Sequence, residues 1–202
     1  MFDMREFGIE IKEEKEKFIY RRNGTEKVIF GKKIQFDLFP VAPSGISSYL
    51  YLKLKTPILI QPGNKIKFRI TAPYDIEVRA LKKGKWISIE RIVTQNEKYA
   101  LYGPIESGVL CRYFESDIGE REDTAILDLG IENQTKEWQE INKIVFPINF
   151  DLSYDKKVHY PPFDLTLTST GLVISKKDTS KGIKEIEKLI NVQKKYTMLW
   201  GY

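Results

Sequence analysis

Residues 49–70 read YLYLKLKTPILIQPGNKIKFRI, and this stretch decides the fold class. Leu50, Leu52 and Leu54 alternate with tyrosine and lysine, and residues 65–70 alternate between charged and apolar side chains after the turn Pro62-Gly63-Asn64. A period of two places the apolar side chains on one face of an extended strand. The stretch therefore predicts two half-buried strands joined by a tight turn.

The same rhythm of strand and turn runs along the chain. Asn23-Gly24 and Lys83-Gly84 each separate two alternating segments, and both dipeptides suit a tight hairpin turn. Turn signals recur about every eight to twelve residues, which is typical of sandwiches and barrels. We predict an all-β fold, a mainly antiparallel two-sheet β-sandwich that forms a single domain over residues 1–202. The alternative is two small β-domains, 1–95 and 96–202.

One segment near the C-terminus departs from the period of two. Ile183, Ile186, Leu189 and Ile190 recur at helical spacing, after Asp178-Thr179-Ser180, whose side chains can cap a first turn. These residues predict a short helix near the C-terminus, covering one end of the sheets.

Several classes of protein and of chemistry are disfavoured. The single cysteine, Cys111, cannot form an internal disulfide, the N-terminus lacks a secretory pattern, and no apolar run approaches the ~20 residues of a membrane-spanning helix. We predict a cytoplasmic protein with no membrane span. No phosphate-binding glycine motif is present, and we predict no cofactor, no metal site and no catalytic residue.

The only histidine, His159, precedes two prolines, and we interpret it as a loop residue rather than a catalytic one. Cys111 lies within a predicted strand, which favours a buried structural thiol. The acidic stretch 115–123 predicts a long loop whose carboxylates are solvated or ion-paired.

The densest group of functional side chains lies in residues 99–114. Tyr102, Glu106 and Arg112 flank a predicted turn, across which Glu106 and Arg112 could pair. With Glu115 and His159 they are our candidate ligand-binding residues, and their clustering in one concave site would favour a small-ligand or carbohydrate-binding protein, or an enzyme.

Basic residues are mostly lysines placed beside predicted turns. The net charge is +5, and the basic pairs are Arg21-Arg22, Lys32-Lys33, Lys82-Lys83 with Lys85, Lys156-Lys157, Lys176-Lys177 and Lys194-Lys195. Charges at hairpin tips protect sheets from edge-to-edge pairing. If several tips converged beside Tyr20, Tyr49, Tyr51 or Tyr99, they would instead form a stacking surface that follows phosphates.

Residues 98–103 (KYALYG), 108–113 (GVLCRY), 137–140 (EWQE) and Trp200-Gly201 resemble an archaeal family, domain of unknown function 432. The likeness includes residues 51–63 and covers most of the chain after about residue 17. It implies an archaeal source and a shared fold, with no established activity, cofactor or site residue.

Our first functional hypothesis is a non-enzymatic binding or scaffolding module that engages another macromolecule, a protein in the first instance, through a sheet face or hairpin tips. The ligand-binding or enzymatic alternative uses the five candidate residues. Nucleic-acid binding is a third hypothesis, and a steep loss of binding with added salt would support it.

Overall fold

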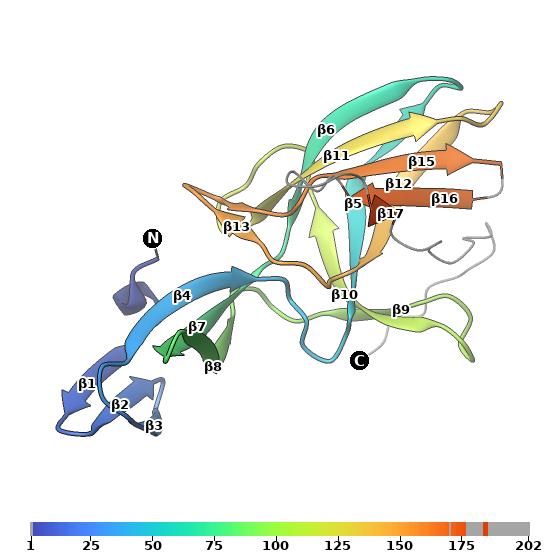
Figure 1. Ribbon diagram of the computed structural model, residues 1–202. Coiled ribbons are helices and arrows are strands. Elements are labelled where there is room, and N and C mark those ends of the chain that lie inside the picture. The colour runs from blue at the N-terminus through green and yellow to red at the C-terminus, as the bar shows by residue number, and fades with distance from the viewer. Residues whose placement is uncertain (1, 170, 177–183, 186–202) are drawn as a thin grey trace. The chain divides into compact units, whose positions relative to one another are not determined.

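The computed structural model of the chain describes residues 2–169, 171–176 and 184–185 (Figure 1). Nearly every regular element is a strand, and most strand pairs are antiparallel, which confirms the predicted fold class. The strands form four sheets rather than two. Contacts divide the chain into two compact units, with two sheets in each: Met1–Val41 with Asp75–Ile92 (unit 1), and Ala42–Tyr74 with Val93–Tyr202 (unit 2).

Both units are discontinuous in sequence, so neither coincides with the halves 1–95 and 96–202. Compactness does not show whether the two units fold independently, so the single domain over residues 1–202 stays a prediction. Alternation shows which residues of a strand are buried but not which sheet the strand joins, and this is why the number of sheets was underestimated.

Unit 1 contains two three-stranded sheets, with strand orders β1-β2-β3 and β4-β7-β8. Its elements are the 3₁₀ helix η1 (Met4–Phe7), β1 (Glu10–Glu14), β2 (Lys17–Arg22), β3 (Thr25–Phe30), β4 (Gln35–Val41), β7 (Asp75–Lys82) and β8 (Lys85–Val93). Phe18, Ile34 and Ala80 form a buried cluster, and the Phe18 ring lies edge-on to Phe36 at 5.4 Å. The two sheets therefore share one apolar core.

Tight turns set the hairpins of unit 1, as predicted. Asn23 and Gly24 have φ angles of 45° and 78°, and Lys83 and Gly84 have 50° and 74°. Positive φ at both central residues matches the right-handed twist of the flanking strands, which is the reason these dipeptides are strong hairpin signals.

Unit 2 contains a four-stranded sheet, β12-β5-β10-β9, and a seven-stranded sheet, β13-β14-β11-β15-β16-β17 with β6 also paired to β11. The strands are β5 (Tyr49–Ile60), β6 (Lys65–Ala72), β9 (Tyr99–Tyr102), β10 (Val109–Ser116), β11 (Ala125–Asn133), β12 (Gln139–Pro147), β13 (Ser153–Tyr154), β14 (Val158–His159), β15 (Phe163–Thr168), β16 (Gly171–Lys176) and β17 (Lys184–Glu185). The ring centroids of Phe146 on β12 and Phe163 on β15 are 5.1 Å apart, so side chains of the two sheets meet in a common core.

Three strand pairs of unit 2 are parallel: β5 with β10, and β11 with β14 and with β15. Parallel partners are far apart in sequence and need long connections, so no local pattern predicts them.

The predicted C-terminal helix falls largely outside the described residues. Within 183–190 only Lys184 and Glu185 are described, and they form β17, paired with β16, instead of helix. No helix among the described residues is long and apolar enough to cross a membrane.

Candidate functional site

The five candidate residues occupy separate positions in unit 2. Tyr102 ends β9, Glu106 lies exposed in the turn 103–108, Arg112 and Glu115 lie on β10, and His159 lies on β14 of the other sheet. Since Arg112 pairs in register with Leu50 while Tyr113 pairs with Tyr51, the pleat places Arg112 on the Leu50 face of the sheet. Tyr102 packs with Tyr51 on the opposite face. Tyr102 and Arg112 therefore do not share a site.

Arg112 is almost completely buried, with 2% of its surface exposed. Its guanidinium forms an ion pair with Glu97 at 2.5 Å, donates to the Gln95 carbonyl at 3.0 Å and lies over the Tyr99 ring. Its carboxylate partner is thus Glu97, not Glu106, because Arg112 points into the sandwich while Glu106 lies in an exposed turn. Through these three contacts Arg112 holds residues 95–99 against β10, which is a structural role.

Cys111 is fully buried beside Tyr51, Tyr102 and Tyr113, as the structural interpretation of this cysteine predicts. Burial raises the pKa of the Cys111 thiol to about 12. At neutral pH the thiol stays protonated, and a protonated thiol is a poor nucleophile.

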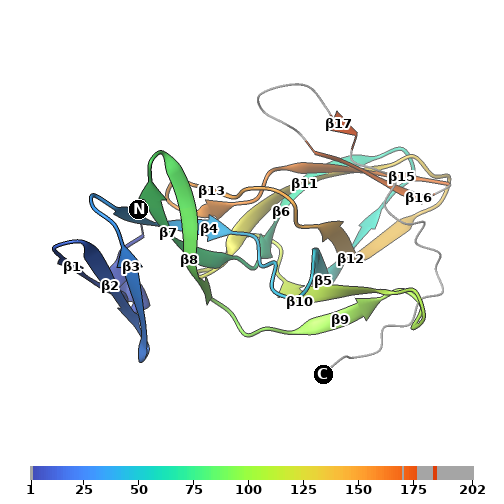
Figure 2. The same ribbon diagram turned by 60° about the horizontal axis from the view of Figure 1, so that its bottom comes forward.

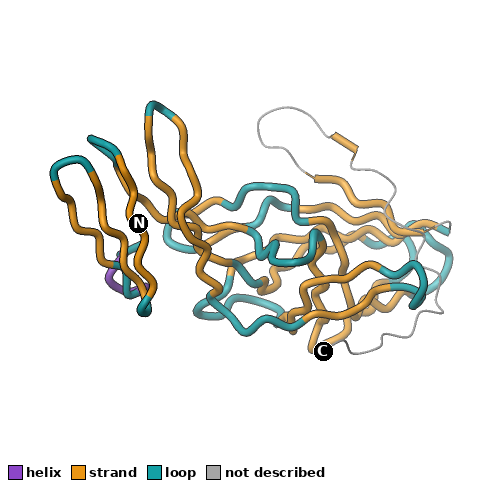
Figure 3. Tube along the Cα trace, turned by 90° about the horizontal axis from the view of Figure 1, so that it is seen from below, coloured by secondary structure: helices purple, strands orange, loops and turns teal. Residues whose placement is uncertain are grey.

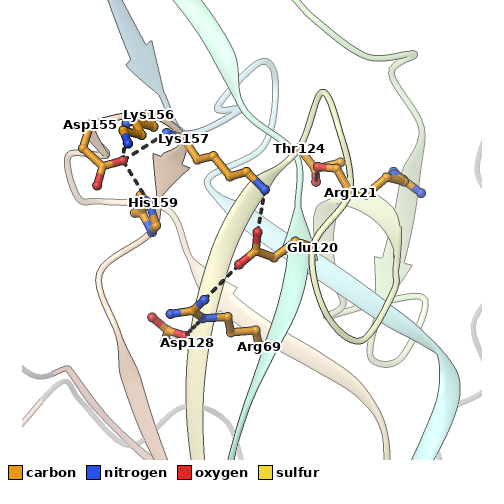
Figure 4. A network of polar contacts seen from close by, with 9 residues as sticks. All are labelled: Arg69, Glu120, Arg121, Thr124, Asp128, Asp155, Lys156, Lys157 and His159. Atoms are coloured by element: carbon orange, nitrogen blue, oxygen red, sulfur yellow. Dashed lines mark hydrogen bonds and ion pairs between the residues drawn. The ribbon is translucent and has the colours of Figure 1, made fainter.

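In the acidic loop after β10, Asp117 and Glu120 are ion-paired while Glu122 and Asp123 are exposed to solvent, as the prediction of solvated or ion-paired carboxylates has it. Figure 4 shows Glu120 between Lys157 and Arg69, with Arg69 also bonded to Asp128; the Arg69 distances are 2.9 Å and 2.8 Å. The ammonium of Lys157 lowers the pKa of Glu120. Asp117 pairs with Lys55 and Arg121, and the Lys55 hydrogen bond lowers the pKa of Asp117.

His159 lies beside this network on a two-residue strand, not in a loop. Its Nε2 is 3.4 Å from Asp155, whose carboxylate also accepts from the backbone N–H groups of Lys156 and Lys157. The hydrogen bond from the Lys157 N–H, and after it the one from the Lys156 N–H, lower the pKa of Asp155.

We name the group around Glu120 the paired-charge face. Its members are Arg69, Glu120, Asp128 and Lys157, with Lys55, Asp117 and Arg121. In the described part of the chain no three His, Cys, Asp or Glu side chains gather as a metal site.

A different arrangement of charge occurs in unit 1, where three turns lie together. The Gly31 N–H donates to the Glu16 carbonyl at 2.9 Å, the Lys32 ammonium pairs with Glu16 at 2.6 Å, and the Lys82 ammonium donates to the Phe30 carbonyl at 3.2 Å. These bonds join the β1–β2, β3–β4 and β7–β8 turns, which lie side by side in Figures 2 and 3. We call residues 14–17, 30–33 and 82–85 the lysine turns.

Charge is strongly segregated onto the lysine turns. They contain seven lysines and two glutamates, whereas the rest of unit 1 contains seven basic and nine acidic residues. Glu14 pairs with Lys17 and Lys12, and Glu16 with Lys32. Among the described residues, the remaining side chains Lys15, Lys33, Lys83 and Lys85 form no ion pair.

Apolar side chains are exposed at the same place. The four large apolar residues that the described part of unit 1 exposes lie on or within two residues of the lysine turns: Val28, Phe30, Trp86 and Ile87. Phe30 is 72% exposed, and Trp86, 38% exposed, rests edge-on against Phe39. Exposed apolar groups that cluster, rather than scatter, mark interaction sites.

Comparison with known proteins places the chain in a family. Residues 1–199 match the family described as "Protein of unknown function (DUF432)". The chain belongs to the DUF432 family. No curated protein and no solved structure matches the chain.

In this DUF432 chain the lysine turns combine features that the sequence showed separately. The pairs Lys32-Lys33 and Lys82-Lys83 are basic tips in the sequence, and the structure brings their turns together. Of the tyrosines expected as stacking partners, Tyr20 is fully buried and donates its hydroxyl to Glu90, and Tyr51 is buried in the core of unit 2. The exposed aromatic residues beside these lysines are Phe30 and Trp86. The sequence alone does not show that their side chains are exposed.

Proposed function

We propose that this protein is a non-enzymatic binding module that engages an acidic macromolecule through the lysine turns of unit 1. The observation that supports this function best is the coincidence of exposed apolar side chains with lysines that form no ion pair within the described part of the chain, which we call the unpaired lysines. Either feature alone has a structural explanation, since lysines protect strand edges and isolated exposed apolar residues are common. Their concentration in and beside the lysine turns does not follow from either.

The placement of charges supports the same proposal. Lysines without an acidic partner repel one another, and this repulsion disfavours the folded unit unless a polyanion neutralises it. On the paired-charge face of unit 2, by contrast, Glu120 and Asp117 each pair with two cations, and Asp128 pairs with Arg69. A polyanion therefore gains more from the lysine turns.

The five candidate residues lend less support to a small-ligand site. Arg112 and Tyr102 lie on opposite faces of one sheet, and His159 lies on the other sheet, with its Nε2 3.4 Å from Asp155. A pocket for a small ligand requires polar groups that converge on one point.

Heparin, a soluble polyanion, provides a direct test of the proposed function. The variant Lys33→Gln/Lys83→Gln/Lys85→Gln removes three of the unpaired charges. A matched control, Lys53→Gln/Lys67→Gln/Lys136→Gln, removes three exposed lysines of unit 2. We expect the first variant to elute from a heparin column at clearly lower salt than the wild type, and the control to elute close to it. Equal shifts for both variants would show that only net charge matters, and would contradict the proposal.

A further inference from the structure

The arrangement of lysines and rings in the lysine turns identifies a class of polyanion. We propose that the lysine turns bind single-stranded nucleic acid, with lysines contacting phosphates and Phe30 stacking on a base. This inference rests on the proposed function, because it names the partner of the same surface.

The first argument is the type of basic residue. All the basic side chains of the three turns are lysines, with no arginine. Lysine acts as a mobile point charge on a phosphate, whereas the planar fork of arginine gives the fixed two-bond geometry that suits base edges in a duplex groove. Lysine is also depleted from protein–protein interfaces, where arginine is enriched. The composition thus favours backbone contact without sequence readout.

The second argument is the presence of exposed rings beside the lysines. Phe30 ends β3 and pairs in register with Lys17 of β2, and its carbonyl accepts from Lys82 of β7, so lysines of two other strands lie next to it. With 72% of its surface exposed, the ring is available for contact with a base. Bases of a single strand expose their faces, and stacking on aromatic side chains is the usual source of affinity for them.

The third argument is the order of charge and ring along each turn, which disfavours a lipid surface. Lys83-Gly84 and Lys32-Lys33 form the tips, while Phe30 and Trp86 lie farther back on the strands. Residues that enter a bilayer interface need their apolar groups in front and their charges behind. Here the charges are in front, which suits a flexible strand whose phosphates meet the tips while its bases turn toward the rings.

The magnitude of the salt effect follows from the four unpaired lysines. For single strands the logarithm of the association constant falls by about 0.7 per neutralised phosphate for each tenfold rise in salt. About four contacts then predict a roughly 50-fold loss of affinity between about 50 and 200 mM salt. The Lys33→Gln/Lys83→Gln/Lys85→Gln variant should reduce the slope by about 2.

The experiment measures binding of the full chain to fluorescein-labelled oligothymidylate by anisotropy, with a duplex of equal length and polyglutamate as competitors. We expect the single strand to bind tightest. We also expect Phe30→Ala to weaken its binding about tenfold while leaving the salt slope and the heparin elution unchanged, since Phe30 carries no charge. Phe30→Tyr, which keeps a ring, should retain most of the affinity, and thermal melting should show that both variants fold.

The outcomes separate the two proposals. If duplex or polyglutamate competes as well as the single strand, or if Phe30→Ala binds as the wild type does, the inference about single strands is wrong while the lysine turns remain a polyanion surface. If the triple-lysine variant and its unit 2 control bind alike, the proposed function fails as well.

Discussion

The lysine turns of unit 1 and the paired-charge face of unit 2 use the same residue types in opposite ways. On the paired-charge face, Glu120 joins Lys157 and Arg69, and Asp117 joins Lys55 and Arg121. In the lysine turns, Lys15, Lys33, Lys83 and Lys85 have no acidic partner among the described residues. The number of basic residues is therefore a poor guide to a binding surface. Whether acidic side chains lie beside the basic ones determines whether the surface attracts a polyanion.

The largest effect should come from giving the lysine turns acids of their own. In Lys33→Glu/Lys83→Glu/Lys85→Glu the remaining lysines gain carboxylate partners, so the turns come to resemble the paired-charge face. We expect affinity for oligothymidylate at about 50 mM salt to fall at least about 100-fold, because phosphate contacts are lost and repulsion replaces them. Anisotropy measures the loss. Binding within about threefold of the wild type would contradict the role of these turns.

The reverse change should create a second polyanion surface. Asp117→Asn/Glu120→Gln/Asp128→Asn leaves Arg69, Lys157, Lys55 and Arg121 without their acidic partners. We expect the apparent affinity for heparin to rise roughly tenfold. The control Glu106→Gln/Glu122→Gln/Glu137→Gln makes the same change in net charge with exposed glutamates that pair with no basic side chain the structure describes. An equal rise in this control would show that overall charge, not pairing, governs binding.

The sequence predicts those parts of the two surfaces that depend on neighbouring residues, and not those that depend on residues far apart in the chain. The turns themselves were predictable, because Asn23-Gly24 and Lys83-Gly84 adopt positive φ for local reasons. The meeting of the β1–β2, β3–β4 and β7–β8 turns was not, because it depends on the packing of two sheets of unit 1. Likewise Arg112 pairs with Glu97, fifteen residues earlier, rather than with the nearer Glu106, because the pleat turns its side chain inward.

Acid should weaken the paired-charge face and leave the lysine turns charged. The pKa values of Glu120 and Asp117 are lowered in the folded protein, so these carboxylates stabilise it above their unfolded pKa values. The stabilisation is lost as the pH falls from the unfolded pKa values through the lower folded ones. We expect thermal melting of the wild type to be more acid-sensitive in this range than that of Asp117→Asn/Glu120→Gln. Equal sensitivity would show that the two carboxylates are not linked to stability.

The smallest effects should differ in sign between the surfaces. Lys85→Gln removes repulsion in the lysine turns and should raise the melting temperature, whereas Glu120→Gln breaks two ion pairs and should lower it. Each shift should be no more than about 2 °C, because both sites are exposed and screened. Differential scanning calorimetry at low salt measures both. Shifts of the same sign would contradict the distinction between unpaired and paired charges.

The most direct test is to map where a single strand binds, using amide chemical shifts of the ¹⁵N-labelled full chain titrated with oligothymidylate. We expect the largest shifts at residues 14–17, 30–33 and 82–86, with the amides of Arg69, Glu120 and Lys157 unchanged. Shifts concentrated on the paired-charge face, or spread evenly over lysines of both units, would contradict the claim that unpaired lysines and exposed rings of unit 1 form the binding surface.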